Sequence, residues 1–121
     1  MTATAETGRK GEQAVAEYLR REGFELCALN WRSGRYELDI IARKDDELHI
    51  VEVKTRRADG LTAPEAAMTP QKQRALLHAA RAYLAWTHWM GEVRFDLAAV
   101  DCFSDGRMEV RLIPDALQCH W

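Results

Sequence analysis

The sequence has no apolar run that approaches the roughly 20 residues of a membrane-spanning helix. Its first residues also lack the basic and then apolar layout of a secretory signal peptide. Cysteine is scarce, with only three residues, and no two of them have the spacing of a zinc-binding motif. We therefore expect a cytoplasmic protein with free thiols and no association with membranes.

An excess of charge of one sign is also missing. Charged residues make up 30% of the 121-residue chain, yet the formal net charge is only −2. The chain as a whole is no polycation, so any contact with nucleic acid must come from a local basic patch. Hydrophobic residues make up 47%, which is enough for a core, and the length fits one domain. We expect a flexible N-terminal tail over residues 1–7 and a single domain over 8–121.

The apolar pattern predicts the order helix, three strands, helix, two strands. The first helix is expected over 8–22, where Gly23 stops it. The second starts at Thr69-Pro70, because Thr is a good N-cap and Pro suits the first helical turn. This order, α-β-β-β-α-β-β, is typical of an α/β domain with a mixed central sheet flanked by helices. Strands are predicted at 24–29, 37–41, 51–54, 93–100 and 108–113, with loops over 30–35 and 56–68.

Two of these strands carry acids at positions normally held by Val or Ile, and the polar residues 44–47 between them are typical of a tight turn. A turn centred between residues 45 and 46 places Asp39 opposite Glu52. Glu37 then lies opposite Lys54 on the same face. Opposed residues have Cβ atoms roughly 5 Å apart, so the two carboxylates repel each other unless a cation lies between them. The other face, which enters the core, consists of Leu38, Ile40, Val51 and Val53.

This carboxylate pair matches the needs of metal-dependent phosphodiester hydrolysis. Mg²⁺ or Mn²⁺ prefers oxygen ligands, which Asp39 and Glu52 supply. Glu12 is the expected third acid, because its side of the first helix borders the apolar stripe. Lys54 shares the face of Glu52, where it either orients the attacking water or stabilises the developing negative charge. We predict that Asp39, Glu52, Lys54 and Glu12 are catalytic and that Asp39, Glu52 and Glu12 bind the metal.

Each of these residues also has a structural interpretation. A Glu early in a helix complements the helix dipole, which would account for Glu12. Asp39 or Glu52, taken singly, is an ordinary exposed strand residue. Glu37 and Lys54 would form a cross-strand ion pair. The combination favours a site, because the structural interpretation does not require Asp39 and Glu52 to meet.

Basic residues lie on both sides of the acidic strands. Together they predict a phosphate-binding rim that would contact DNA. For any single one of them, the alternative is a solvated charged surface. The rim is predicted to contain Arg32, Arg35, Arg56, Arg57 and Lys72, with Arg74 beside Lys72 at the start of the second helix.

Five short segments of the chain have a pattern known from one bacterial family. They are Gly8-Arg9-Lys10-Gly11-Glu12, Asn30-Trp31-Arg32, Glu37-Leu38-Asp39-Ile40-Ile41-Ala42, Val51-Glu52-Val53-Lys54-Thr55-Arg56 and Arg94-Phe95-Asp96. In these segments the chain resembles the YraN family, which is similar to archaeal Holliday-junction resolvases and belongs to the PD-(D/E)XK nuclease-like group. The resemblance implies a restriction-endonuclease-like core with a magnesium-type site. It makes Glu12 the helix acid, Asp39 the strand acid, and Glu52 with Lys54 the Glu-x-Lys motif.

The chain departs from this pattern at two positions. Leu38 stands where the group has its name-giving Pro, and Tyr36 stands where the family usually has Gly before the acidic strand. Both changes affect the approach to the site and leave the acids in place.

Three functions are compatible with these observations. The leading one is a metal-dependent endonuclease with DNA as its partner, acting on branched or repair intermediates with Mg²⁺ or Mn²⁺. A homodimer would suit that function, because resolvases cut two strands symmetrically. The first alternative is a non-catalytic nucleic-acid-binding or adaptor protein that retains the nuclease fold. The second is a protein-interaction module that uses the Trp-bearing end of the second helix.

Overall fold

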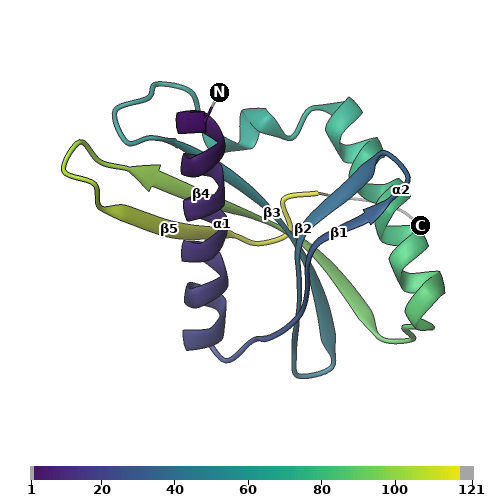
Figure 1. The fold of residues 1–121 in the computed structure, drawn as a ribbon. Coiled ribbons are helices and arrows are strands. Elements are labelled where there is room, and N and C mark those ends of the chain that lie inside the picture. Colours follow the sequence, from purple (N-terminus) through teal and green to yellow (C-terminus); the bar gives the residue numbers. More distant parts are fainter. Residues whose placement is uncertain (1, 118–121) are drawn as a thin grey trace.

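The predicted order of elements is confirmed by the computed structural model, which describes residues 2–117, with side chains from Ala5 onward. Five strands form one mixed sheet, and a helix packs against each face (Figure 1). The elements are α1 (Thr2–Arg21), β1 (Glu25–Ser33), β2 (Tyr36–Lys44), β3 (Glu47–Arg57), the 3₁₀ helix η1 (Pro64–Ala67), α2 (Pro70–Thr87), β4 (Glu92–Cys102) and β5 (Met108–Ile113).

The strands lie side by side in chain order, from β1 to β5. The pairs β1–β2, β2–β3 and β4–β5 are antiparallel, whereas β3 and β4 run parallel along their whole length. Parallel neighbours need a crossover connection, and η1 with α2 supplies it. The two central strands are therefore covered on both faces, by α1 on one side and α2 on the other.

Two apolar clusters hold the helices to the sheet. The α2-side cluster includes Leu38, Ile41 and Ile50 from the sheet with Leu76 from the helix. The α1-side cluster is built around Val15, Leu19, Ile40, Val51 and Val100. In the described chain, Asp96 is the only buried charged residue, so the core is otherwise apolar.

Strand alternation fails at Asp39, which is one of the predicted site residues. Leu38 packs in the α2-side cluster, whereas Ile40, two positions later, packs in the α1-side cluster. The prediction that Leu38 shares a face with Ile40 is therefore wrong. On the neighbouring β1, Asn30 lies between the partners of Leu38 and Ile40 and has a left-handed φ of 52°. Such local irregularities re-aim side chains within a sheet, and this one lies at an acidic residue of interest.

Three boundaries differ from the sequence-based prediction. The first helix begins at Thr2, so the segment predicted as a flexible tail is helical from that residue onward. The strand β1 continues to Ser33, because its last residues pair with β2, and the predicted loop shrinks to a turn at Gly34 with a φ of 60°. The predicted loop over 56–68 begins two residues later and contains η1.

The described residues also bear on the predictions about thiols and membranes. Cys27 and Cys102 are free thiols, as expected, while Cys119 lies outside the described residues. Within residues 2–117, neither helix is both long and apolar enough to cross a bilayer.

Candidate active site

The predicted register of the acidic hairpin is confirmed where the two strands are paired. Residues Ile40–Lys44 face Val51–Glu47, with the turn at residues 45 and 46. The ladder ends at Ile40 and Val51, one position before the two acids. Beyond that point a side chain replaces the backbone pairing, because Oδ2 of Asp39 accepts a hydrogen bond of 2.9 Å from the backbone N–H of Val53. This bond fixes the Asp39 carboxylate beside Glu52.

Glu52 is an acid held in a largely buried position. Its side chain is only 12% exposed, and its Oε2 accepts a contact of 2.9 Å from Nζ of Lys72. Among residues 2–117, Oε1 is buried and accepts no hydrogen bond, while the protonated Glu52 carboxyl shares a hydrogen bond with the Asp39 side chain. Burial raises the pKa of Glu52 to about 7, and the negative charge of Asp39 adds to the rise, while Lys72 opposes it. The carboxylates of Asp39 and Glu52 therefore repel each other when both are ionised.

Glu12 lies on α1 close enough to Asp39 for the two charges to interact. Burial and the charge of Asp39 raise the pKa of Glu12, and a hydrogen bond with the Asn30 side chain opposes the rise. The neighbouring Gly11 explains how the helix comes so close. A Cβ at Gly11 would lie 2.0 Å from Oγ1 of Thr55, so only glycine allows α1 to pack here on β3.

The donor set fits a hard divalent cation, although the geometry is not that of a complete metal cage. In the described part of the chain, no three Asp, Glu, His or Cys residues converge closely enough to hold a metal. Asp39 and Glu52 nevertheless supply carboxylate oxygens, including the buried Oε1 of Glu52. Oxygen ligands of this kind suit Mg²⁺ and Mn²⁺. Glu12 adds negative charge nearby but does not complete a three-residue cluster with them.

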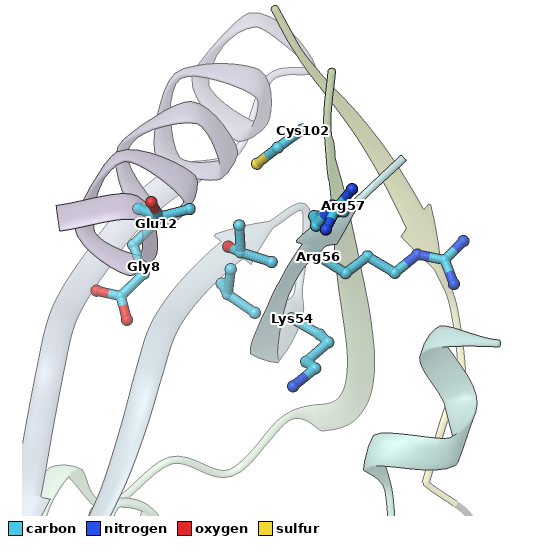
Figure 2. Close-up of a pocket in the computed structure, with 9 residues that line it drawn as sticks. Gly8, Glu12, Lys54, Arg56, Arg57 and Cys102 are labelled. Carbon is cyan, nitrogen blue, oxygen red and sulfur yellow. The ribbon is translucent and has the colours of Figure 1, made fainter. Parts of the chain in front are cut away.

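Lys54 is exposed at the edge of the site. Its ammonium group makes no ion pair or hydrogen bond with the residues that the structure describes. It lines an open hollow of about 450 Å³ together with Glu12, Arg56 and Arg57 (Figure 2). The cross-strand ion pair considered for Glu37 and Lys54 does not form, because Glu37 binds Arg32 instead.

Most of the predicted rim cations are already paired with carboxylates. Arg32 lies 2.9 Å from Glu37, and Lys72 lies in the site on Glu52 rather than at its rim. Arg35 is the exception, since its contact is with the Tyr36 hydroxyl at 3.2 Å. The remaining pairs are Arg56 with Asp101 at 3.0 Å and Arg57 with Asp59 at 3.1 Å.

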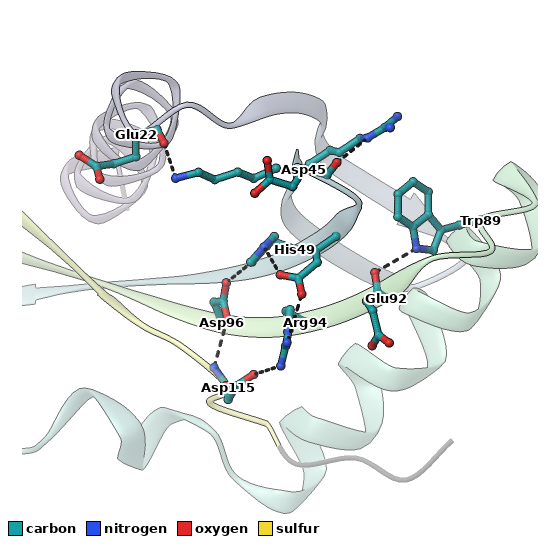
Figure 3. Close-up of polar contacts among 11 residues, drawn as sticks. Glu22, Asp45, His49, Trp89, Glu92, Arg94, Asp96 and Asp115 are labelled. Carbon is teal, nitrogen blue, oxygen red and sulfur yellow. Dashed lines mark hydrogen bonds and ion pairs between the residues drawn. The ribbon is translucent and has the colours of Figure 1, made fainter.

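A second polar cluster lies near the opposite end of β3 and has no counterpart in the predicted site (Figure 3). Asp96 is 3% exposed, and its Oδ2 lies 2.7 Å from Nδ1 of His49. Its Oδ1 accepts a hydrogen bond of 3.1 Å from the backbone N–H of Asp115. Both oxygens are satisfied, and the cluster ties the segment after β5 to the sheet. Its role is therefore structural.

Comparisons with known proteins agree with the resemblance found in the sequence. The family described as uncharacterised protein family UPF0102 matches residues 11–100. A UPF0102 protein of Nitratidesulfovibrio vulgaris is 50% identical over 95 residues, which are 78% of this chain and 71% of that protein. A UPF0102 protein of Porphyromonas gingivalis is 43% identical over 99 residues, covering 82% and 73%. One of Parabacteroides distasonis is 42% identical over 100 residues, 83% of each chain. The chain therefore belongs to the uncharacterised protein family UPF0102, the YraN-like family.

Proposed function

We propose that this protein is a metal-dependent endonuclease that hydrolyses phosphodiester bonds in DNA in the cytoplasm. The observation that carries the proposal is the meeting of Asp39 with the largely buried Glu52, whose Oε1 accepts no hydrogen bond within residues 2–117. Burying an ionised group without full compensation costs free energy. A function that needs paired carboxylates gives a reason for that cost, and binding of Mg²⁺ or Mn²⁺ between them would offset it.

The residues of the site divide the work of hydrolysis. Asp39 and Glu52 would hold the cation, which when bound polarises the phosphate and activates a water. The N–H of Val53 orients Asp39, and Glu12 adds negative charge beside it. The exposed ammonium of Lys54 either orients the attacking water or stabilises charge on the phosphate, as the sequence already suggests.

Several features favour DNA as the substrate. The order of elements agrees with the restriction-endonuclease-like core implied by the resemblance to the PD-(D/E)XK group. The hollow beside Glu12 is open and carries Lys54, Arg56 and Arg57, so a phosphate backbone can approach it (Figure 2). A homodimer acting on branched or repair intermediates would present two such sites to two strands.

The test is cleavage of labelled junction, flap and nicked DNA with Mg²⁺ or Mn²⁺. We expect cleavage by the wild-type protein and its loss in Asp39→Ala and Glu52→Ala. The matched control is Glu17→Gln, which changes an exposed acid on α1 and should leave cleavage unchanged. If every substrate stays intact with both metals at micromolar protein, the nuclease proposal fails.

The second candidate is a non-catalytic nucleic-acid-binding or adaptor protein. The absence of a three-residue metal cluster in the described chain favours it, as do the ion pairs of Arg32, Arg56 and Arg57. This candidate predicts salt-dependent binding of DNA that Asp39→Ala leaves intact, with no cleavage under any condition.

A further inference from the structure

A second hollow lies between the β1–β2 turn and the first turns of α2. Its volume is about 510 Å³. On the helix side its lining residues follow the i, i+3, i+4, i+7 spacing of one helical stripe. On the sheet side it is closed by the residues of the turn. The lining consists of Arg35, Tyr36, Gln71, Arg74, Ala75 and His78.

The hollow carries positive charge that no carboxylate neutralises. Among the described residues, the Arg35 side chain donates only to the hydroxyl of Tyr36, at 3.2 Å, and its guanidinium lies 5.3 Å from the centre of that ring. Within residues 2–117, the side chain of Arg74 forms no ion pair or hydrogen bond. No acidic residue lines the hollow. Two guanidinium groups free to bind an anion contrast with the paired arginines around the carboxylate site.

The same hollow also presents aromatic surface. The rings of Tyr36 and His78 lie 4.2 Å apart, with an angle of 42° between their planes. Tyr36 is half-buried between His78 and the Arg35 guanidinium, whereas His78 is exposed, so a further flat ring can reach His78. Arginines beside aromatic rings are the usual means of binding a single nucleic-acid strand, because the cations hold the phosphate and the rings stack on the base.

The hollow adjoins the carboxylate site along α2. Lys72, which contacts Glu52, lies between Gln71 and Arg74 in the chain. The two sites thus occupy neighbouring stripes of the same helical turns.

We propose that this hollow binds an unpaired nucleotide of a DNA strand. Its phosphate is held by Arg35 and Arg74, and its base stacks on the exposed ring of His78, which Tyr36 supports from the other side. The inference rests on the proposed nuclease function and specifies its substrate, namely DNA with unpaired nucleotides next to the cut, as in a flap or an open branch.

The test measures binding without cleavage. The full chain carrying Glu52→Gln is titrated in EDTA against a fluorescent oligothymidylate and a fluorescent blunt duplex, with fluorescence anisotropy as the readout. Arg35→Ala and Arg74→Ala, alone and together, are compared with Arg111→Ala, which removes an exposed arginine of β5. Both hollow arginines are exposed, so thermal unfolding should be unchanged in these variants.

We expect the single strand to bind more tightly than the duplex. Each arginine removed from the hollow should reduce the slope of log affinity against log salt by about 0.7, the value for one phosphate contact on a single strand. Loss of stacking in His78→Ala should weaken binding about fivefold or more. Arg111→Ala should change neither quantity.

Two results would overturn the inference. One is that the double variant, with Arg35→Ala and Arg74→Ala together, changes the salt slope no more than Arg111→Ala does. The other is a preference for the duplex that His78→Ala leaves unchanged. Because binding is measured in EDTA with a Glu52 variant, these results are independent of the cleavage assay. If the protein cleaves DNA but Arg35→Ala and Arg74→Ala leave binding of the single strand unchanged, the nucleotide site in the hollow is rejected and the nuclease proposal stands.

Discussion

The replacement Glu52→Gln should make this protein more stable, because Glu52 is an unfavourable residue for folding. Burial and the charge of Asp39 raise the pKa of Glu52 from its ordinary value of 4.5 to about 7. A carboxyl group with a raised pKa in the folded state costs no stability below its unfolded pKa. The cost grows as the pH rises from 4.5 to 7 and then stays constant. The amide keeps the shape of the neutral acid at every pH.

The size of the effect follows from the two pKa values. At about 1.4 kcal/mol per pH unit, the difference between 4.5 and about 7 corresponds to about 3 kcal/mol at pH 8. The Gln side chain retains an oxygen that can accept from Lys72, so the contact of 2.9 Å need not be lost. Near pH 4.5 the stabilisation should fall below about 1 kcal/mol, because the acid itself is then largely protonated.

The assay is urea denaturation in EDTA at several pH values between 4.5 and 8, followed by circular dichroism. Glu17→Gln, an exposed acid on α1, is the matched control and should have little effect at any pH. The reasoning is refuted if Glu52→Gln is less stable than the wild type at pH 8. It is equally refuted if the difference between the two proteins does not depend on pH.

Two further predictions concern the support of the site and the second polar cluster. Gly11→Ala should destabilise the protein by about 1–3 kcal/mol, because the added Cβ would lie 2.0 Å from Oγ1 of Thr55. Gly8→Ala, where a Cβ meets nothing within 4 Å, should stabilise α1 by about 0.5–1 kcal/mol, and equal effects in thermal denaturation would contradict the packing argument. Asp96→Ala should cost about 1–3 kcal/mol in urea denaturation, because it leaves His49 and a backbone N–H without their partner. Unchanged stability would show that this cluster is dispensable.

The parts of the fold that depend on neighbouring residues could be predicted from the sequence. Thr69 caps α2 as expected, since its side chain accepts a hydrogen bond from the N–H of Lys72. The hairpin register also followed from local features, because the polar turn and the apolar alternation both constrain it. That register brings the two strands together as far as Ile40 and Val51, and the hydrogen bond from the N–H of Val53 then holds Asp39 beside Glu52.

The failures arose where distant segments decide the outcome. The change of face at Leu38 accompanies the left-handed Asn30 on β1, and a regular alternation gives no warning of it. The pair of Arg56 with Asp101 forms between β3 and β4 after a long crossover. The position of Lys72, by contrast, can be read from the helical periodicity of α2. Lys72 shares a helical stripe with the buried Leu76 and Ala79, which directs it toward the sheet and Glu52.

The most direct test of the central claim is a crystal of the wild-type protein soaked in Mn²⁺ and measured at the manganese absorption edge. We expect an anomalous peak between the carboxylates of Asp39 and Glu52. A parallel soak of Glu52→Gln should reduce or remove the peak. Ordered wild-type carboxylates that diverge, with no peak between them, would contradict a metal-binding site at this position.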